Sequence, residues 1–411
     1  MQQHPQHGYS PRHVALAIAS LAMGGFGIGT IEFAMMGLLP NVAEGVGVSI
    51  PDAGHLISAY ALGVVIGAPV LAAVAAKLPR KSVLLALMGL FTLGNFSSFF
   101  ANDFWSLFIT RFISGLPHGA FFGVAAVVAA SLVAPSKRGR AISMVMLGLS
   151  IANVIGVPAA TFLGQQFGWR LLFVLVALIG ALTVLCIWIS VPAQPAAVGA
   201  SIRGELGALK RVQVWLALLI GIVGFGGFFA VYAYIAPTMT EVTGLAAEWL
   251  PLVVALYGIG MVLGNIVGGR LADRSVMGSI YLMMGVIAVV LLVFSVAVHQ
   301  VWSALPLVLL IGASGSMLVP ALQTRLLDVS PGAPSLASSM NHSALNIANA
   351  LGAFLGGLVI AWGWGYVAPA LVGAGLALLG LGIALLSGRV DRAAARSAAE
   401  SRERLNQPSR H

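Results

Sequence analysis

Two side chains of opposite charge stand inside long apolar segments, where charged groups are rare. Glu32 lies in the run of residues 14–39, and Arg111 lies in the run of residues 104–132. A charge in the hydrocarbon region of a bilayer costs several kcal/mol, so such residues are candidates for function. Each lies about seven residues from the end of its segment at the same membrane surface. At 1.5 Å per residue, this places both roughly 10 Å below that surface. We therefore predict that the carboxylate and the guanidinium form an ion pair inside the membrane.

An ion pair in this position has two interpretations. Removal from water favours the neutral form of a carboxyl group, whereas a nearby guanidinium favours its ionised form. Opening the site to water, or the arrival of a substrate, then decides which influence prevails at Glu32, and a proton is exchanged for the substrate. We favour this proton switch. The alternative, a static salt bridge that only satisfies both charges, stays open.

Other polar side chains lie at mid-membrane depth, and each also has two interpretations. His118, two helical turns from Arg111, can relay protons, but we favour a hydrogen bond across a close helix contact. Tyr232 can contact a substrate with its ring, but packing in the core is favoured. The remaining side chains cannot all face lipid cheaply, so they either join helices or line a cavity; they are Asn153, Asn341, His342, Asn346 and Asn349.

The composition requires these residues to be positioned by membrane-spanning helices. The 411 residues are 59% hydrophobic and only 8% charged, with a mean hydropathy of +0.99, whereas soluble domains carry about 25% charged residues. A helix needs about 20 apolar residues to cross a bilayer. We predict an all-α integral membrane protein with spans near 14–39, 54–76, 82–101, 104–132, 140–163, 169–191, 213–237, 249–271, 278–298, 301–324, 335–361 and 365–387. The first run is too long for a cleavable signal peptide.

Cationic residues gather in alternate loops between these spans. They follow the even-numbered spans and fill the C-terminal tail, whereas the other loops hold mainly acidic residues. By the positive-inside rule, both termini are predicted to be cytoplasmic. The net charge of +9 is therefore a signal of topology rather than of nucleic-acid binding, since the cations are spread over short loops. The single cysteine, Cys186, lies in an apolar run, and no Cys/His spacing predicts a metal site.

A Pro/Ala/Gly-rich segment divides the spans into two sets of six. We predict an N-terminal half over residues 1–191, a cytoplasmic linker over 192–212, a C-terminal half over 213–388 and a basic cytoplasmic tail over 389–411. Two halves of this kind are the plan of the major facilitator superfamily. Residues 29–40, with Glu32, resemble helix 1 of the twelve-helix drug:proton antiporters of that superfamily. Residues 107–123 are similar to its helix 4 motif with a buried arginine, here Arg111.

Two further motifs resemble the parts of that family that change conformation. Residues 148–164 resemble the antiporter motif of helix 5, although Val157 separates Gly156 from Pro158. The segment from Gly269 to Asp273 and Arg274 resembles the signature loop, whose Asp is implied to hold the cytoplasmic side closed. The corresponding loop after the second span keeps the cations Lys77, Arg80 and Lys81 but has Ala76 in place of Asp. The resemblance thus implies a latch dominated by the second half.

The closest outline within the family is that of arabinose-efflux-permease-like members. The resemblance implies a monomeric secondary transporter in the bacterial inner membrane that exports a drug-like, sugar-like or nucleoside-like solute against protons. A proton symporter or facilitator that imports a nutrient is the alternative. No enzyme is expected, because one intramembrane carboxylate and no Cys/His cluster offer too few groups for catalysis. No cofactor is expected, and no phosphate-binding Gly-x4-Gly-Lys-Ser/Thr motif occurs, so the proton gradient is the expected energy source.

Overall fold

The described part of the chain is built from helices that cross a membrane. The computed structural model describes residues 10–75, 78–134, 138–194, 210–330 and 334–406, and within them twelve helical segments are long and apolar enough to span a bilayer. They run over Pro11–Gly37, Ile50–Leu71, Arg80–Phe99, Phe104–Ser131, Ala141–Phe167, Leu171–Ser190, Val212–Ala233, Ala247–Arg274, Val276–Ala297, Val301–Val329, Met340–Trp364 and Ala368–Ala393. The twelve predicted spans are therefore confirmed, with ends that differ by several residues.

The N-terminal half holds the first six spans, two of which are interrupted. Its elements are α1 (Pro11–Gly37), α2 (Leu39–Val46), α3 (Ile50–Ala75), α4 (Arg80–Phe99), α5 (Phe104–Gly115), α6 (His118–Ser131), α7 (Arg138–Ile151), η2 (Ala152–Gly156), α8 (Val157–Phe167) and α9 (Leu171–Ser190). The fourth span breaks at Pro117, which lies between α5 and α6. The fifth contains a π-helical turn, η2, directly before Pro158. Proline and π turns are common causes of bends in helices.

The C-terminal half has the same plan with a more irregular first span. Its elements are α11 (Val212–Leu219), η4 (Ile220–Gly224), α12 (Gly226–Ala233), α13 (Ile235–Pro237), η5 (Thr238–Val242), η6 (Ala247–Trp249), α14 (Leu250–Arg274), α15 (Val276–Ala297), α16 (Val301–Val329), α17 (Pro334–Val359), η7 (Ile360–Trp364) and α18 (Ala368–Asn406). α18 continues past residue 388 without a break, and Asp391 on this part of the helix pairs with Arg325 of α16. The predicted boundary between half and tail stays a prediction.

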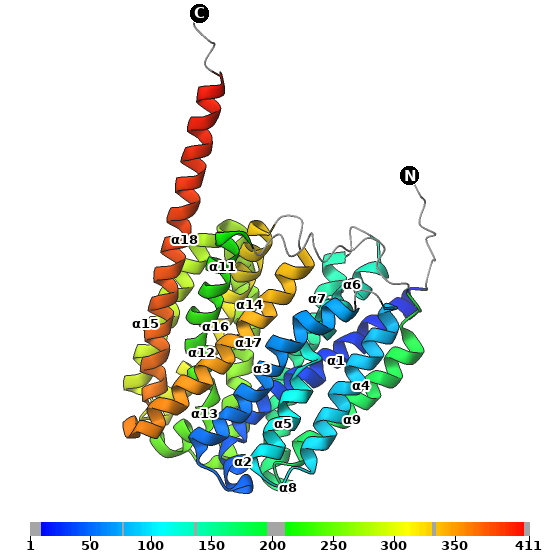
Figure 1. Cartoon of the computed structure of the whole chain (residues 1–411). Coiled ribbons are helices and arrows are strands. Elements are labelled where there is room, and N and C mark those ends of the chain that lie inside the picture. The colour runs from blue at the N-terminus through cyan, green and yellow to red at the C-terminus, as the bar shows by residue number, and fades with distance from the viewer. Residues whose placement is uncertain (1–9, 76–77, 135–137, 195–209, 331–333, 407–411) are drawn as a thin grey trace, which may run out of the picture.

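Both ends of the described chain lie on one side of the bundle. α1 begins and α18 projects at the upper edge of the view in Figure 1. We call this end the terminal side and the opposite end the far side. Most of the predicted linker lies outside the described residues, between the terminal-side ends of α9 and α11.

Glycines allow the closest helix contact in the C-terminal half. A side chain at Gly264 or Gly268 of α14 would collide with the backbone of Ala313 or Met317 on α16. Such small-residue contacts are how helices pack tightly in lipid, where apolar surfaces gain little from association. α14 and α16 therefore form a rigid pair within this half.

The two halves are joined on the far side. The Gln165 amide donates to the Ala247 carbonyl over 2.9 Å, between α8 and η6. Closer to the membrane centre, the Ser58 hydroxyl donates to the Ala350 carbonyl over 3.3 Å, between α3 and α17. The backbone of Asn153 in η2 also lies directly against Gly258 of α14. The far side is therefore closed in this conformation.

Candidate functional site

Glu32 lies in the far-side third of α1. It is 6% exposed and forms no hydrogen bond with the residues that the structure describes. Its neighbour Phe33 packs on two rings of α12, with centres 5.6 Å away at Tyr232 and 6.5 Å away at Phe229. Phe33 thus contacts α12 of the other half directly beside Glu32 in the sequence.

Arg111 occupies the fully buried face of α5. Its Nε donates to the Leu56 carbonyl at 3.5 Å, and its Cζ lies 4.4 Å from the centre of the Tyr60 ring, which belongs to α3. Neither Nη1 nor Nη2 has a hydrogen-bond partner among the described residues. Unsatisfied donors of a buried guanidinium are costly, so this geometry leaves the arginine in need of an acceptor.

The predicted ion pair between Glu32 and Arg111 is not formed in this conformation. Within the described ranges, the one carboxylate–cation pair closer than 4.0 Å joins Arg325 to Asp391. The reason is that α3 supplies Arg111 with an aromatic ring and a carbonyl in place of the carboxylate. The two charges remain within electrostatic range of each other, as do Glu32 and the hydroxyls of Tyr60 and Tyr232.

Tyr232 contributes both a packed ring and an unsatisfied hydroxyl. Its ring stacks on Tyr257 of α14 with centres 3.8 Å apart and planes 6° apart, as the packing interpretation predicts. Tyr257 donates its own hydroxyl to the Phe228 carbonyl at 3.1 Å. The buried hydroxyl of Tyr232, by contrast, has no partner among the described residues. A donor, a guanidinium and a carboxylate therefore converge here without bonding one another.

His118 begins α6 and forms the helix contact that the sequence favoured. Its Nδ1 is 3.1 Å from the Tyr60 hydroxyl. On its other side lies His342 of α17, with ring centres 6.5 Å apart. Phe122 stacks on the His342 ring at 5.7 Å with planes 4° apart. His118 thus links α3 of its own half with α17 of the other.

The buried amides mostly bond within their own helices. Asn153 donates to Leu149 and Asn346 donates to His342, both backbone carbonyls, at 3.0 Å. Asn341 instead joins two helices, since it donates to the Gln323 side chain of α16 at 2.7 Å. The side-chain oxygens of Asn153 and Asn346 and both amide atoms of Asn349 lack partners among the described residues.

The predicted gating residues lie apart from this cluster. In the fifth span, Gly156 is the last residue of the π turn η2 and packs against Thr30 of α1. Pro158 is the second residue of α8. On the terminal side, Lys81 donates to the Trp188 carbonyl at 2.7 Å, and the Arg80 amide donates to Gln194. The first contact lies within the N-terminal half, and the second joins that half to the described start of the predicted linker. Lys77 lies outside the described residues.

The signature-loop residues of the second half are not engaged in this conformation. Asp273 and Arg274 end α14 and are exposed, and neither has an ion pair among the described residues. Gly269 faces open space. The latch that the resemblance implies therefore stays a prediction.

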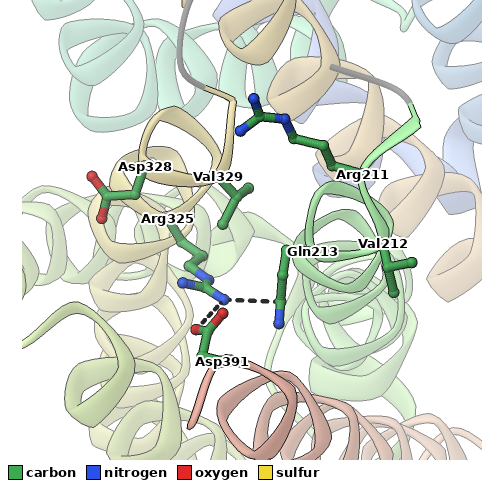
Figure 2. A pocket seen from close by; sticks show the side chains of 7 residues that line it. All are labelled: Arg211, Val212, Gln213, Arg325, Asp328, Val329 and Asp391. Carbon is green, nitrogen blue, oxygen red and sulfur yellow. Dashed lines mark hydrogen bonds and ion pairs between the residues drawn. The ribbon is translucent and has the colours of Figure 1, made fainter. Parts of the chain in front are cut away.

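A polar network around Arg325 was not predicted as a site. This guanidinium donates to Gln213 at 2.9 Å, to the Ser387 hydroxyl at 3.0 Å and to Asp391 at 2.6 Å. Figure 2 shows it reaching toward Gln213 and Asp391 at one wall of a cavity of about 500 Å³. The network fastens α11, α16 and α18 together at the terminal side. The sequence signal was only that Gln213 and Ser387 interrupt apolar runs.

Two six-helix halves that close over buried, unpaired charges define a membrane transport protein. The chain belongs to the Major Facilitator Superfamily, whose sequence model matches residues 21–333 and 252–410. It is therefore a transporter and not an enzyme. It is 42% identical over 372 residues, 90% of the chain and 96% of the relative, to the inner membrane transport protein YdhP of Escherichia coli K12.

Two further relatives are similar to the chain over most of its length. The putative transporter AraJ of Escherichia coli K12 is 34% identical over 378 residues, covering 91% of the chain and 95% of AraJ. A chloramphenicol resistance protein of Streptomyces lividans is 34% identical over 364 residues, covering 86% of the chain and 90% of the relative. The resemblance to arabinose-efflux-permease-like members is thereby confirmed.

Proposed function

We propose that this protein exports a small solute across the bacterial inner membrane in exchange for protons, with both termini in the cytoplasm. The observation that carries the proposal is the set of unpaired buried groups between the halves, namely Glu32, the Arg111 Nη atoms and the Tyr232 hydroxyl. Because each is desolvated without a bonding partner, Glu32 gains by binding a proton, and the donors of Arg111 and Tyr232 gain by binding an acceptor atom of the cargo.

Glu32 and Arg111 have different roles in this scheme. Glu32 takes a proton while the far side is open, and the neutral acid then enters the closed form at low cost. The Arg111 fork and the Tyr232 hydroxyl donate to oxygen atoms of the cargo. A cargo that also donates a hydrogen bond to the ionised Glu32 competes with the proton, because protonation turns an acceptor oxygen of the carboxyl group into a donor. Alternating access converts that competition into exchange.

Export and the nature of the cargo are proposed on separate grounds. The helix 5 motif around Gly156 and Pro158 resembles that of antiporters, and a relative carries the name of a chloramphenicol resistance protein. Donors for oxygen acceptors beside the rings of Phe33, Phe229 and Tyr232 suit a drug-like, sugar-like or nucleoside-like solute with one apolar face. No cofactor enters the proposal, since the proton gradient is the energy source.

The test compares Glu32→Gln with the wild type in liposomes. Chloramphenicol is the first probe, followed by a panel of sugars and nucleosides selected by thermal shift of the purified protein. We expect Glu32→Gln to lose transport driven by an imposed pH gradient but to retain counterflow, which moves no net proton. Glu44→Gln is the matched control, because Glu44 is an exposed acid of α2 and its loss leaves both activities intact.

Two results would contradict the proposal. Undiminished proton-driven transport by Glu32→Gln removes Glu32 from the coupling. Uptake of the probe together with protons, in vesicles of known orientation, replaces the exporter by the importing symporter. The direction of flux under an imposed pH gradient thus separates the two functions.

A further inference from the structure

We propose that Tyr60, His118 and His342 form a proton path that carries the Glu32 proton toward the terminal side, and that this path crosses from one half to the other at the two histidines. The inference rests on the proposed function, because it supplies the exit that a proton bound at Glu32 needs. With the far side closed by the contacts between Gln165 and Ala247 and between Ser58 and Ala350, the proton must leave in the opposite direction.

The residues of the path follow one another in depth. Glu32 and Tyr60 are within electrostatic range, and the Tyr60 hydroxyl is hydrogen-bonded to His118 Nδ1 at 3.1 Å. His118 faces His342 with ring centres 6.5 Å apart. His342 is the eighth residue after Pro334, where α17 begins, so it lies roughly 12 Å from that end of the helix at 1.5 Å per residue. It is also only half-buried, whereas His118 and Tyr60 are buried.

Each member of the path can accept a proton on one side and release another on the opposite side. When the Tyr60 hydroxyl donates to Nδ1 of His118, the imidazole N–H of His118 is at Nε2. A proton that leaves Glu32, through a water molecule, binds the Tyr60 oxygen as the tyrosine proton passes to Nδ1. The Nε2 proton then passes through a second water to one ring nitrogen of His342, whose other nitrogen gives up its proton to water on the terminal side. Every group regains one proton for the one it loses, and the net result is the movement of one proton.

The surroundings limit the path to these groups. The other charged or titratable side chains that face it are Arg111, which covers the Tyr60 ring, and Tyr232, which lies near Glu32. Arg111 cannot give up its proton under physiological conditions. Phe122 stacks on His342 and fixes its ring. Because α6 and α17 belong to different halves, the path exists only while the halves meet at this level, which ties proton release to the conformation.

The test measures how fast Glu32 loses its proton, without any transported solute. The carbonyl stretch of the protonated Glu32 carboxyl is identified in the infrared spectrum by its absence in Glu32→Gln. After a rapid rise in pH, the decay rate of that band is compared between wild type, His118→Gln and His342→Gln. Removal of a positioned proton-transfer group typically costs about 10²-fold or more in rate, and we expect a slowing of at least about tenfold in each variant.

Matched controls separate a proton path from a structural role. His55 lies on α3 beside Phe354, with ring centres 6.0 Å apart, away from the path, so His55→Gln is expected to leave the rate unchanged. In His342→Ala, added imidazole should restore the fast decay, whereas a packing defect would not respond to it. Folding of each variant is checked by its thermal unfolding midpoint, and His342→Phe replaces His342→Gln if that variant fails to fold.

The outcomes distinguish the two proposals. Decay rates within twofold of wild type in His118→Gln and His342→Gln overturn the path while leaving Glu32 as the coupling acid. If no titrating carboxyl band is lost in Glu32→Gln, the proposed function itself fails. Slow decay that imidazole restores supports both.

Discussion

The guanidinium of Arg111 lies over the ring of Tyr60, with Cζ 4.4 Å from the ring centre. This cation–π contact takes the place of the ion pair with Glu32 that the sequence predicts. A buried contact of this kind contributes about 2 kcal/mol, less than the several kcal/mol lost when a charge leaves water. The arginine is therefore held in position but incompletely compensated, which suits a residue that must bind and release a partner.

The two parts of Tyr60 should be separable by substitution. Tyr60→Phe keeps the ring under Arg111 and removes the hydroxyl that bonds His118, so we expect a loss of about 1 kcal/mol. Tyr60→Leu also removes the ring, so its loss should be larger by about 1–2 kcal/mol. Thermal unfolding of the purified variants in one detergent measures both. Equal unfolding midpoints for the two variants would show that the ring contributes nothing to holding Arg111.

Gly258 should control closure of the far side. Its Cα hydrogens lie against the backbone of Asn153, and any side chain there would push α14 away from η2. Overpacking of this kind costs about 1–3 kcal/mol, so Gly258→Val should shift the population toward the form open on the far side by about fivefold or more. Gly285→Val is the control, since Gly285 faces open space.

The shift can be measured between spin labels on the two halves. Exposed Glu44 of α2 and Glu248 of η6 are replaced by cysteine in a Cys186→Ser background, and the distance distribution is recorded for each variant. A longer component should grow in Gly258→Val and stay unchanged in Gly285→Val. A distribution identical to that of the parent would contradict a role for this contact in closure.

Asp273 should act in the opposite direction. It is exposed and has no ion pair with the described residues in this conformation, so Asp273→Asn costs this form little. If Asp273 holds the terminal side closed in the other form, its loss weakens only that form. An exposed charge contact is worth up to about 1 kcal/mol, and the population should move toward the present conformation by up to about fivefold.

The same pair of labels reports this change as a gain of the shorter distance. Asp328→Asn is the control, because Asp328 is another exposed acid on the terminal side, at the end of α16. A gain of the longer distance in Asp273→Asn, or an equal change in both variants, would argue against the latch.

Sequence alone predicted the spans and the two charges because both follow from the cost of burial. A run of apolar residues has one low-energy conformation in lipid, and Glu32 and Arg111 are conspicuous inside such runs. The missing ion pair could not be foreseen, because it depends on how far α1 and α5 are rotated and on which rotamer Arg111 adopts. Those quantities are set by packing against α3, which supplies Tyr60.

The Arg325 network escaped prediction for a similar reason. Its members come from three segments that are distant in the sequence, near residues 213, 325 and 390, and only the packed helices bring them together. The sequence also does not show that the hydroxyl of Tyr60 has a functional role, because tyrosine is equally common as a packing residue in apolar segments. The position of a charge along an apolar run indicates its depth in the membrane. Which faces of two helices meet is determined by the packing of the whole bundle.

The capping of α5 should give the far side a pH-dependent contribution to stability. Asp103 accepts hydrogen bonds from the Ser106 and Trp105 amides and from the Ser106 hydroxyl, and these bonds lower the pKa of its carboxyl group. A lowered pKa means that the stabilisation is complete above the usual value of about 4 and is lost as the pH falls through the folded-state value. Asp103→Ala should therefore lower the unfolding midpoint at pH 7 but make no difference in strong acid. A constant difference across that range would contradict this origin.

Arg325 should be the main fastening of the C-terminal half on its terminal side. Its removal leaves Asp391, which is 39% exposed, free to take up water, and Ser387 keeps its own bond to Gln213 at 2.7 Å. The cost of Arg325→Ala should therefore be about 1–3 kcal/mol, below the 3–5 kcal/mol typical of a fully buried pair. Arg389→Ala removes an exposed arginine of α18, two residues before Asp391, and should cost almost nothing. Because the network lies outside the Glu32 site, Arg325→Ala should lower the thermal unfolding midpoint without changing the ratio of proton-driven transport to counterflow. A change in that ratio at unchanged stability would instead make Arg325 part of the coupling.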